Sequence, residues 1–273
     1  MTRTHFIRLG STVLGAAILS ACSHTSQFTS GKSYLNTYEH PAYAASTSID
    51  QEVRDIAAIE PRLEFPARIG LARIQKGRLT SIPGDEVTAW QTLKDDLGGT
   101  YGDFVPVSPL VAAMVSRPAE KGTAGAKRVV DDIRRGSARQ HLDYVLIYEV
   151  TQMSGKTSNA LRLTDLSILG LYVMPSRKVE IEATASAMLI DVRNGYPYGS
   201  ASAYAEKAET VTVAGLNTAK IKLSGKSRVQ AVENLTGDVA AFLEELKTAS
   251  RTLNMAETET TVPKVATIGT NRH

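Results

Sequence analysis

The sequence contains one cysteine and one tryptophan in 273 residues, Cys22 and Trp90. A single cysteine excludes an intrachain disulfide, a dithiol redox pair and a site built from several thiolates. Aromatic residues make up only 6% of the chain, which argues against a sugar-binding surface lined with exposed tryptophans. The formal net charge is +3, so the composition does not favour nucleic acid as a partner.

Patterns typical of metal sites and catalytic sites are also missing. Of the five histidines, the four after residue 21 are scattered, with none three or four residues from another histidine or a glutamate: His24, His40, His141 and His273. The chain has no Gly-x-Ser-x-Gly elbow and no Ser-x-x-Lys set with its partner motifs. Ser-Gly-Lys-Ser/Thr occurs at 30–33, 154–157 and 224–227, without the upstream glycines of a phosphate-binding loop. We interpret these tetrapeptides as turns.

Paired carboxylates are the remaining candidates for acid-base chemistry. Three adjacent pairs lie in predicted helices: Asp95-Asp96, Asp131-Asp132 and Glu244-Glu245. Neighbouring residues on a helix point about 100° apart, so each pair is predicted to be a solvent-facing helix surface. His141, with a carboxylate such as Asp143, is the candidate for a hydrolase site, and the alternative is a helix-terminal or surface histidine.

The first 21 residues have the order of a signal peptide. Arg3 and Arg8 give a positive start, residues 9–19 form a short apolar run, and small residues precede Cys22. The run is shorter than the roughly 20 residues of a membrane-spanning helix. Removing residues 1–21 leaves 252 residues and lowers the formal charge by two, to about +1.

The segment Leu19-Ser20-Ala21-Cys22 resembles the lipobox of bacterial lipoproteins. The resemblance implies cleavage between Ala21 and Cys22, with a diacylglycerol and an N-acyl chain on Cys22 and no other cofactor. Ser23 resembles the outer-membrane pattern, which implies a periplasm-facing lipoprotein of that membrane. The alternatives are an ordinary secretory signal with a chance cysteine, or a buried structural cysteine.

Three regions follow the signal peptide. Residues 22–48 are rich in Ser, Thr, Ala and Tyr and predict a flexible, lipid-anchored tether. Residues 49–250 predict a single α/β domain, and residues 251–273 a disordered tail. Up to residue 150 the domain alternates strands with helices, typical of a sheet with parallel neighbours. The strands are predicted at 67–74, 104–107 and 143–150, and the helices from residue 49 and at 85–97, 110–115 and 126–140.

The second half of the domain has a different pattern. Residues 154–156 predict a turn, and residues 178–191 alternate strictly between apolar and polar, as in a half-buried antiparallel strand. Asn194-Gly195 predicts a hairpin turn that leads to a return strand over 196–205, and the long outgoing strand would project beyond the body. An amphipathic helix over 227–249 would pack on the sheet. The sequence therefore predicts a mixed sheet with helices packed on it, a long antiparallel hairpin and a C-terminal helix.

One apolar stretch is a candidate interaction patch, with a buried strand as the alternative. Its residues are Leu166, Ile168, Leu169, Leu171, Tyr172, Val173 and Met174.

The strand ending in Asp143-Tyr144-Val145-Leu146-Ile147 and the hairpin at Asp191-Val192-Arg193-Asn194-Gly195 resemble parts of a known domain. This α/β domain is shared by the curli-secretion lipoprotein CsgG, the amino-terminal domain of TolB and the LpoB-type activators of peptidoglycan synthases. The resemblance covers about residues 65–248, and a further one is to the rhombotarget lipoproteins. It implies a non-enzymatic protein that binds other envelope proteins or builds a secretion pore.

We therefore expect a lipid-anchored periplasmic adaptor or assembly factor that acts through contacts with an envelope protein. A homo-oligomeric export component of the outer membrane, in which residues 161–205 contribute to a ring, is the alternative. It is weakened because only residues 178–205 form a clearly long, paired hairpin. A cell-envelope hydrolase at His141 and Asp143 is the third hypothesis.

Overall fold

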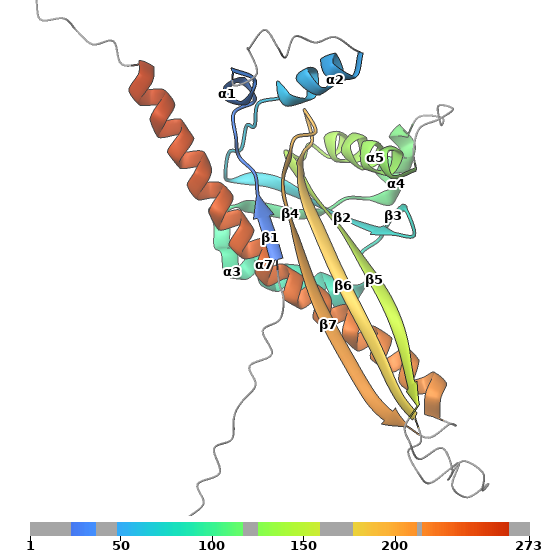
Figure 1. Ribbon diagram of the computed structural model, residues 1–273. Coiled ribbons are helices and arrows are strands. Elements are labelled where there is room, and N and C mark those ends of the chain that lie inside the picture. Colours follow the sequence, from blue (N-terminus) through green and yellow to red (C-terminus); the bar gives the residue numbers. More distant parts are fainter. Residues whose placement is uncertain (1–22, 37–47, 117–124, 159–176, 212–214, 262–273) are drawn as a thin grey trace, which may run out of the picture.

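Seven strands form one mixed sheet in the computed structural model, which describes residues 23–36, 48–116, 125–158, 177–211 and 215–261 (Figure 1). The strands follow the order β1-β7-β6-β5-β2-β3, and β4 pairs with the same side of β2 as β3. Their bounds are β1 Ser23–Ser26, β2 Ala67–Gln75, β3 Arg78–Thr80, β4 Gly102–Pro106, β5 Tyr144–Ser158, β6 Arg177–Asp191 and β7 Pro197–Val211. The predicted α/β class with a mixed sheet is confirmed.

Helices cover both faces of this sheet. Their bounds are α1 Gly31–Asn36, α2 Ser48–Ala57, α3 Gly84–Leu97, α4 Pro109–Val115, α5 Gly125–Arg139 and α7 Leu216–Thr261, with a short 3₁₀ turn at Gly98–Thr100. Two consecutive residues of β5 point to the two faces of the sheet: Leu146 packs with α3 and α7, whereas Val145 packs with Ile133 of α5. Burying one such side chain contributes about 1.5–3 kcal/mol, so both layers stabilise the fold.

The strands and helices that the sequence predicts between residues 49 and 150 are present, whereas β3 was not predicted. β2 pairs in parallel with β4 and β5, and its residues are buried on both faces. Ser108 caps α4 by accepting a hydrogen bond from the Val111 amide at 3.4 Å, and Pro109 stands at the first helical position. Pro106 is the last residue of β4, a position where the strand does not need the backbone N–H that proline lacks.

β5, β6 and β7 continue past the rest of the sheet as a three-stranded extension, which α7 follows along one face (Figure 1). Gly195 takes a φ of 78° in the predicted hairpin turn. The Asp191 carboxylate accepts hydrogen bonds from the Arg193 and Asn194 amides. The turn predicted at 154–156 is wrong, because β5 continues there and Ser154 pairs with Ile181. Fifteen paired residues on β6 override the local turn preference of Ser and Gly.

Two parts of the chain differ from the predicted tether and tail. Residues 23–26 form β1 on the edge of β7, and α1 follows at Gly31–Asn36, so this described part of the 22–48 segment is not a flexible tether. α7 begins eleven residues before the predicted helix and continues to Thr261, past the predicted boundary at 250. The early start places Leu223 against Val179 and Ile181 of β6, a contact that no local pattern reveals.

Candidate binding groove and anchoring strand

Most residues of the predicted sites lie outside the described part of the chain. These are Ala21 and Cys22 of the cleavage and lipidation site, and the apolar patch Leu166, Ile168, Leu169, Leu171, Tyr172, Val173 and Met174. Their roles stay predictions. Within the described residues, no group of three or more His, Cys, Asp or Glu is placed to hold a metal ion.

His141 and Asp143 have separate surroundings. Asp143 Oδ1 accepts a hydrogen bond from Arg193 Nη2 at 2.8 Å, and Oδ2 accepts one from the Arg68 amide at 2.9 Å. His141 is exposed with a φ of 57°, and its carbonyl accepts a hydrogen bond from Arg68 Nη1 at 3.3 Å. The Asp143 carboxylate therefore joins β2 to the 191–197 turn instead of orienting His141.

The acidic pairs lie at helix surfaces, as predicted, but some members have specific partners. Asp132 accepts a hydrogen bond from Arg135 Nη1 at 2.8 Å, and its other oxygen lies 4.0 Å from Arg128 Nε. Glu244 accepts a hydrogen bond from the Tyr101 hydroxyl. Glu245 contacts β1 and is described below.

The Ser-Gly-Lys tetrapeptides have three different settings. The one at 154–157 lies within β5 and the one at 224–227 within α7, so the interpretation of both as turns is wrong. The one at 30–33 begins α1, where the Glu60 carboxylate accepts hydrogen bonds from the Gly31 and Lys32 amides at 3.2 and 2.7 Å. A carboxylate of the chain itself thus occupies this helix N-terminus.

A buried ionic network joins β2, α3 and α7, and no sequence pattern predicts it. Glu86 is fully buried and binds Arg73 at 2.8 and 3.1 Å, while Tyr148 donates a hydrogen bond to Glu86 Oε2 at 2.9 Å. Arg228 of α7 lies 3.1 Å from Glu86 Oε1 and also binds Asp85. Burial and the adjacent Glu86 carboxylate raise the pKa of Tyr148 above its usual value. Since Glu86 is inaccessible and both its oxygens are bound, this network joins elements and does not receive a substrate.

β1 holds the start of the described chain on the sheet. Ser23, the residue after Cys22, pairs with Ser202 of β7, and the antiparallel pairing continues to Ser26 and Gly199. Glu245 of α7 accepts hydrogen bonds from His24 Nε2 at 2.9 Å and from the Ser26 hydroxyl at 2.8 Å. Position 22 is therefore one residue from a strand at one edge of the sheet.

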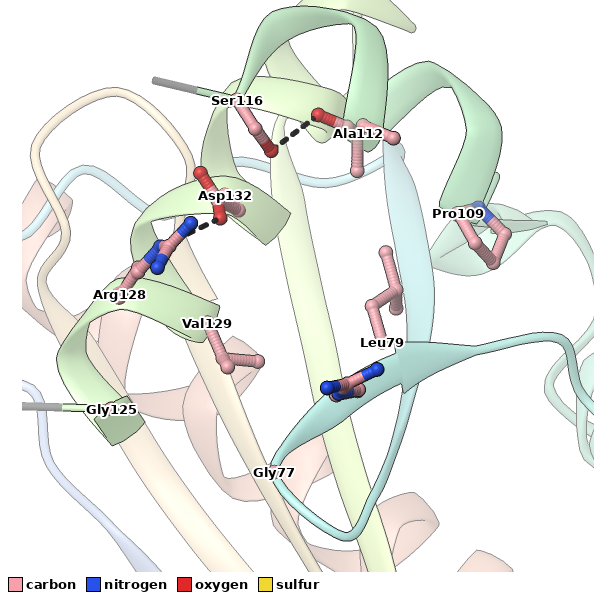
Figure 2. A pocket seen from close by; sticks show the side chains of 11 residues that line it. Gly77, Leu79, Pro109, Ala112, Ser116, Gly125, Arg128, Val129 and Asp132 are labelled. Atoms are coloured by element: carbon pink, nitrogen blue, oxygen red, sulfur yellow. Dashed lines mark hydrogen bonds and ion pairs between the residues drawn. The ribbon is translucent and has the colours of Figure 1, made fainter. Parts of the chain in front are cut away.

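A groove lies at the opposite edge, where the β3 hairpin meets α4 and α5 (Figure 2). It has a volume of about 410 Å³. Its lining residues are Gly77, Arg78, Leu79, Pro109, Ala112, Ala113, Ser116, Gly125, Arg128, Val129 and Asp132. Leu79, Ala112 and Val129 give it an apolar surface, and the Ser116 hydroxyl donates to the Ala112 carbonyl at 2.9 Å (Figure 2).

Local backbone chemistry shapes the groove. Lys76 and Gly77 have φ values of 51° and 69°, a two-residue turn that places Arg78 and Leu79 at the end of the sheet. α4 and α5 approach closely because Gly136 has no side chain: a Cβ there would lie 2.8 Å from the Ala112 Cβ. The groove was not predicted from the sequence because β3 has three residues, too few to show periodicity.

The groove lies in basic surroundings with exposed apolar side chains beside it. Residues 76–80, 109–116 and 125–132, which contain its lining, carry four basic and two acidic side chains. The basic ones are Lys76, Arg78, Lys127 and Arg128. Leu110 and Met114, one turn apart on α4, are 79% and 84% exposed. Such a surface suits a partner that brings negative charge together with apolar groups.

No protein-family model matches the sequence, and no curated protein matches it. Among solved structures, a minor lipoprotein from Acinetobacter baumannii is similar, with 12% identity, coverage of 64% of this chain and 89% of that chain, and a TM-score of 0.34. Lipoprotein GNA1162 from Neisseria meningitidis has 18% identity, coverage of 59% and 96%, and a TM-score of 0.31. A PelC dodecamer from Paraburkholderia phytofirmans has 14% identity, coverage of 64% and 92%, and a TM-score of 0.24. Similarity at this level assigns no function to the chain.

None of the described helices combines the length and the apolar character that crossing a bilayer would need.

Proposed function

We propose that this chain is a non-enzymatic, lipid-anchored protein of the bacterial envelope that holds a protein partner in the groove between β3, α4 and α5. In this proposal Cys22 carries the lipid, in the periplasm-facing leaflet of the outer membrane. The lipobox resemblance of residues 19–22 supports the anchor, and Ser23 supports the choice of membrane.

The observation that carries the proposal is the position of the groove relative to the anchor. β1, which begins one residue after Cys22, is the first strand across the sheet, and β3, which lines the groove, is the last. Five strand spacings of about 4.8 Å separate them by about 24 Å. An acyl chain at Cys22 would therefore hold the opposite edge, with its groove, away from the lipid.

Crosslinking in intact cells tests the adaptor role. A photoreactive residue in place of Arg78 is expected to capture one envelope protein, whereas the same residue in place of Asp95, which is exposed on α3, is not. Cys22→Ser is expected to abolish labelling by an alkyne fatty acid and to move the protein out of the outer-membrane fraction. Equal captures at positions 78 and 95 would contradict an adaptor that uses this groove.

The mass of the lipidated protein separates this proposal from the export alternative. In mild detergent, an adaptor is expected to run as one copy with or without its partner. A homo-oligomeric export component would form a ring of many copies under the same conditions.

A further inference from the structure

We infer that the groove between β3, α4 and α5 binds an extended acidic segment of a partner protein, with an aliphatic side chain against Leu79, Ala112 and Val129. This inference rests on the proposed adaptor function and adds the chemistry of the partner. It follows from the size of the groove, its charges, its position beside an edge strand and its distance from the anchored edge.

The size of the groove favours a few side chains over a whole helix. About 410 Å³ lies near the lower end of the roughly 300–1,000 Å³ range of ligand clefts. A helix with its side chains is about 10–12 Å across, so two turns of helix have a larger volume than this groove. An extended segment can place one or two side chains in the groove and continue over the surface beside Leu110 and Met114.

The charges select an acidic segment. Arg78 and Arg128 both line the groove, and the carboxylate among the lining residues, Asp132, already accepts a hydrogen bond from Arg135. Arg128 forms an ion pair with Asp132 at 4.0 Å, which is too long for a direct hydrogen bond, and its side chain is 47% exposed (Figure 2). Each guanidinium can donate two parallel hydrogen bonds to a carboxylate, which gives geometric selectivity as well as attraction.

The strand arrangement favours an extended conformation. β3 is the last strand of the sheet, and within the described residues its outer edge has no strand partner. An edge strand presents unpaired backbone N–H and C=O groups, which an incoming extended segment can use. The groove lies beside this edge, because Gly77, Arg78 and Leu79 are part of its lining.

Position argues against an anionic lipid surface as the occupant. The lipid attached at Cys22 would lie next to β1, about five strand spacings from β3. While β1 is paired with β7, the proposed attachment point of that lipid and the groove lie at opposite edges of the sheet. A protein segment that approaches from the side away from the membrane meets no such constraint.

Selection from a displayed library of random twelve-residue peptides tests the inference, with the purified full chain as bait. The variants are Arg78→Glu and Arg128→Glu, and the matched control is Arg139→Glu. Arg139 is an exposed arginine of the same helix, two turns beyond the lining residues. Thermal unfolding of every variant verifies that it is folded.

Selected peptides are expected to be rich in Asp and Glu with aliphatic residues between them. Each charge reversal in the groove, Arg78→Glu or Arg128→Glu, should weaken the binding of such a peptide about tenfold or more. Arg139→Glu should leave the affinity within about twofold of the wild-type value. Peptides without acidic enrichment, or binding that is unchanged by both reversals, would overturn the inference.

Three further outcomes identify another occupant and would also overturn it. The first is binding of the wild type to phosphatidylglycerol vesicles that both reversals abolish, which assigns the groove to lipid. The second is self-association of the wild type that is lost in the variants, which assigns it to a second copy. The third is peptide binding that appears only after residues 117–124, which join Ser116 to Gly125, are replaced by a Gly-Ser linker. This result assigns the groove to that segment of the chain.

The peptide selection and the crosslinking experiment test different claims, so one can fail while the other succeeds. A partner captured at position 78 together with a failed peptide selection would remove the acidic segment and keep the adaptor. Acidic peptides that bind the groove without any partner captured in cells would remove the adaptor role and keep the binding chemistry.

Discussion

The imidazole of His24 lies 2.9 Å from the carboxylate of Glu245, so the first strand contacts the last helix across 221 residues of sequence. The other carboxylate oxygen accepts a hydrogen bond from Ser26 at 2.8 Å. Glu245→Ala removes both acceptors and is expected to loosen β1 without releasing it, because the pairing with β7 and the stacking of Phe28 on Tyr198 remain. Hydrogen exchange of the Gln27 amide, which donates to the Tyr198 carbonyl at 2.7 Å, reports the change. The Val107 amide, bound to the Leu71 carbonyl, is the internal control and should keep its protection.

The same contact predicts a dependence on pH. The hydrogen bonds from His24 and Ser26 lower the pKa of Glu245 from the ordinary value of 4.5. When the folded protein lowers the pKa of a carboxyl group, the charged group stabilises the fold at any pH above its ordinary pKa. The stabilisation of docked β1 is therefore lost as the pH falls through the lowered pKa of Glu245. Protection of the Gln27 amide, corrected for intrinsic exchange, is expected to decrease as the pH falls from about 5 through the lowered pKa, which lies below 4.5. Glu245→Gln should remove this step, and a step of equal size in the variant would assign the effect to other groups.

Loss of the buried carboxylate at position 86 should be the most damaging single change in the network. Glu86→Ala leaves Arg73, only 3% exposed, with its charge unpaired inside the protein. Breaking a buried ion pair by removing one partner costs about 3–5 kcal/mol. Urea unfolding is expected to show a decrease of that size in the free energy of unfolding. Asp95→Ala, at an exposed position of the same helix, should change it by less than about 0.5 kcal/mol.

Two glycines in helices are expected to respond in opposite directions to the same substitution. Gly136→Ala places a Cβ 2.8 Å from the Ala112 Cβ and 2.9 Å from its Cα, so α4 must move away from α5. Overpacking of this kind costs about 1–3 kcal/mol, and movement of α4 should also alter the groove. At Gly237 of α7 a Cβ would meet nothing within 4 Å, and Gly237→Ala should stabilise the protein by about 0.5–1 kcal/mol. Thermal unfolding of the pair tests both signs, and destabilisation by both variants would contradict the account of Gly237.

The body of the fold could be predicted from local patterns because its elements are amphipathic or turn-bounded. Residues 179–189 alternate between the two faces, and Asn194-Gly195 forms the turn that its composition predicts. β1 could not be predicted in this way, since Ser23–Ser26 has no apolar pattern and its partners are Gly199 to Ser202 and Glu245. The groove was missed for a related reason: its lining comes from three short stretches, and residues 78–80 acquire strand geometry only by pairing with β2.

Docking of β1 also determines how far the domain can lie from the lipid that we propose on Cys22. With Ser23 paired to Ser202, the residue that would carry the lipid directly precedes the sheet. Thr25→Pro removes a backbone N–H and should release β1, since proline is not tolerated inside a paired strand. Residues 23–30, which precede α1, could then extend as far as about 26 Å at about 3.3 Å per residue. Energy transfer from Trp90, the single tryptophan, to a dansyl lipid in vesicles that hold the acylated protein measures the separation. Transfer is expected to fall in Thr25→Pro and to stay unchanged in Thr25→Val, and equal transfer in all three proteins would show that β1 does not hold the domain at the bilayer.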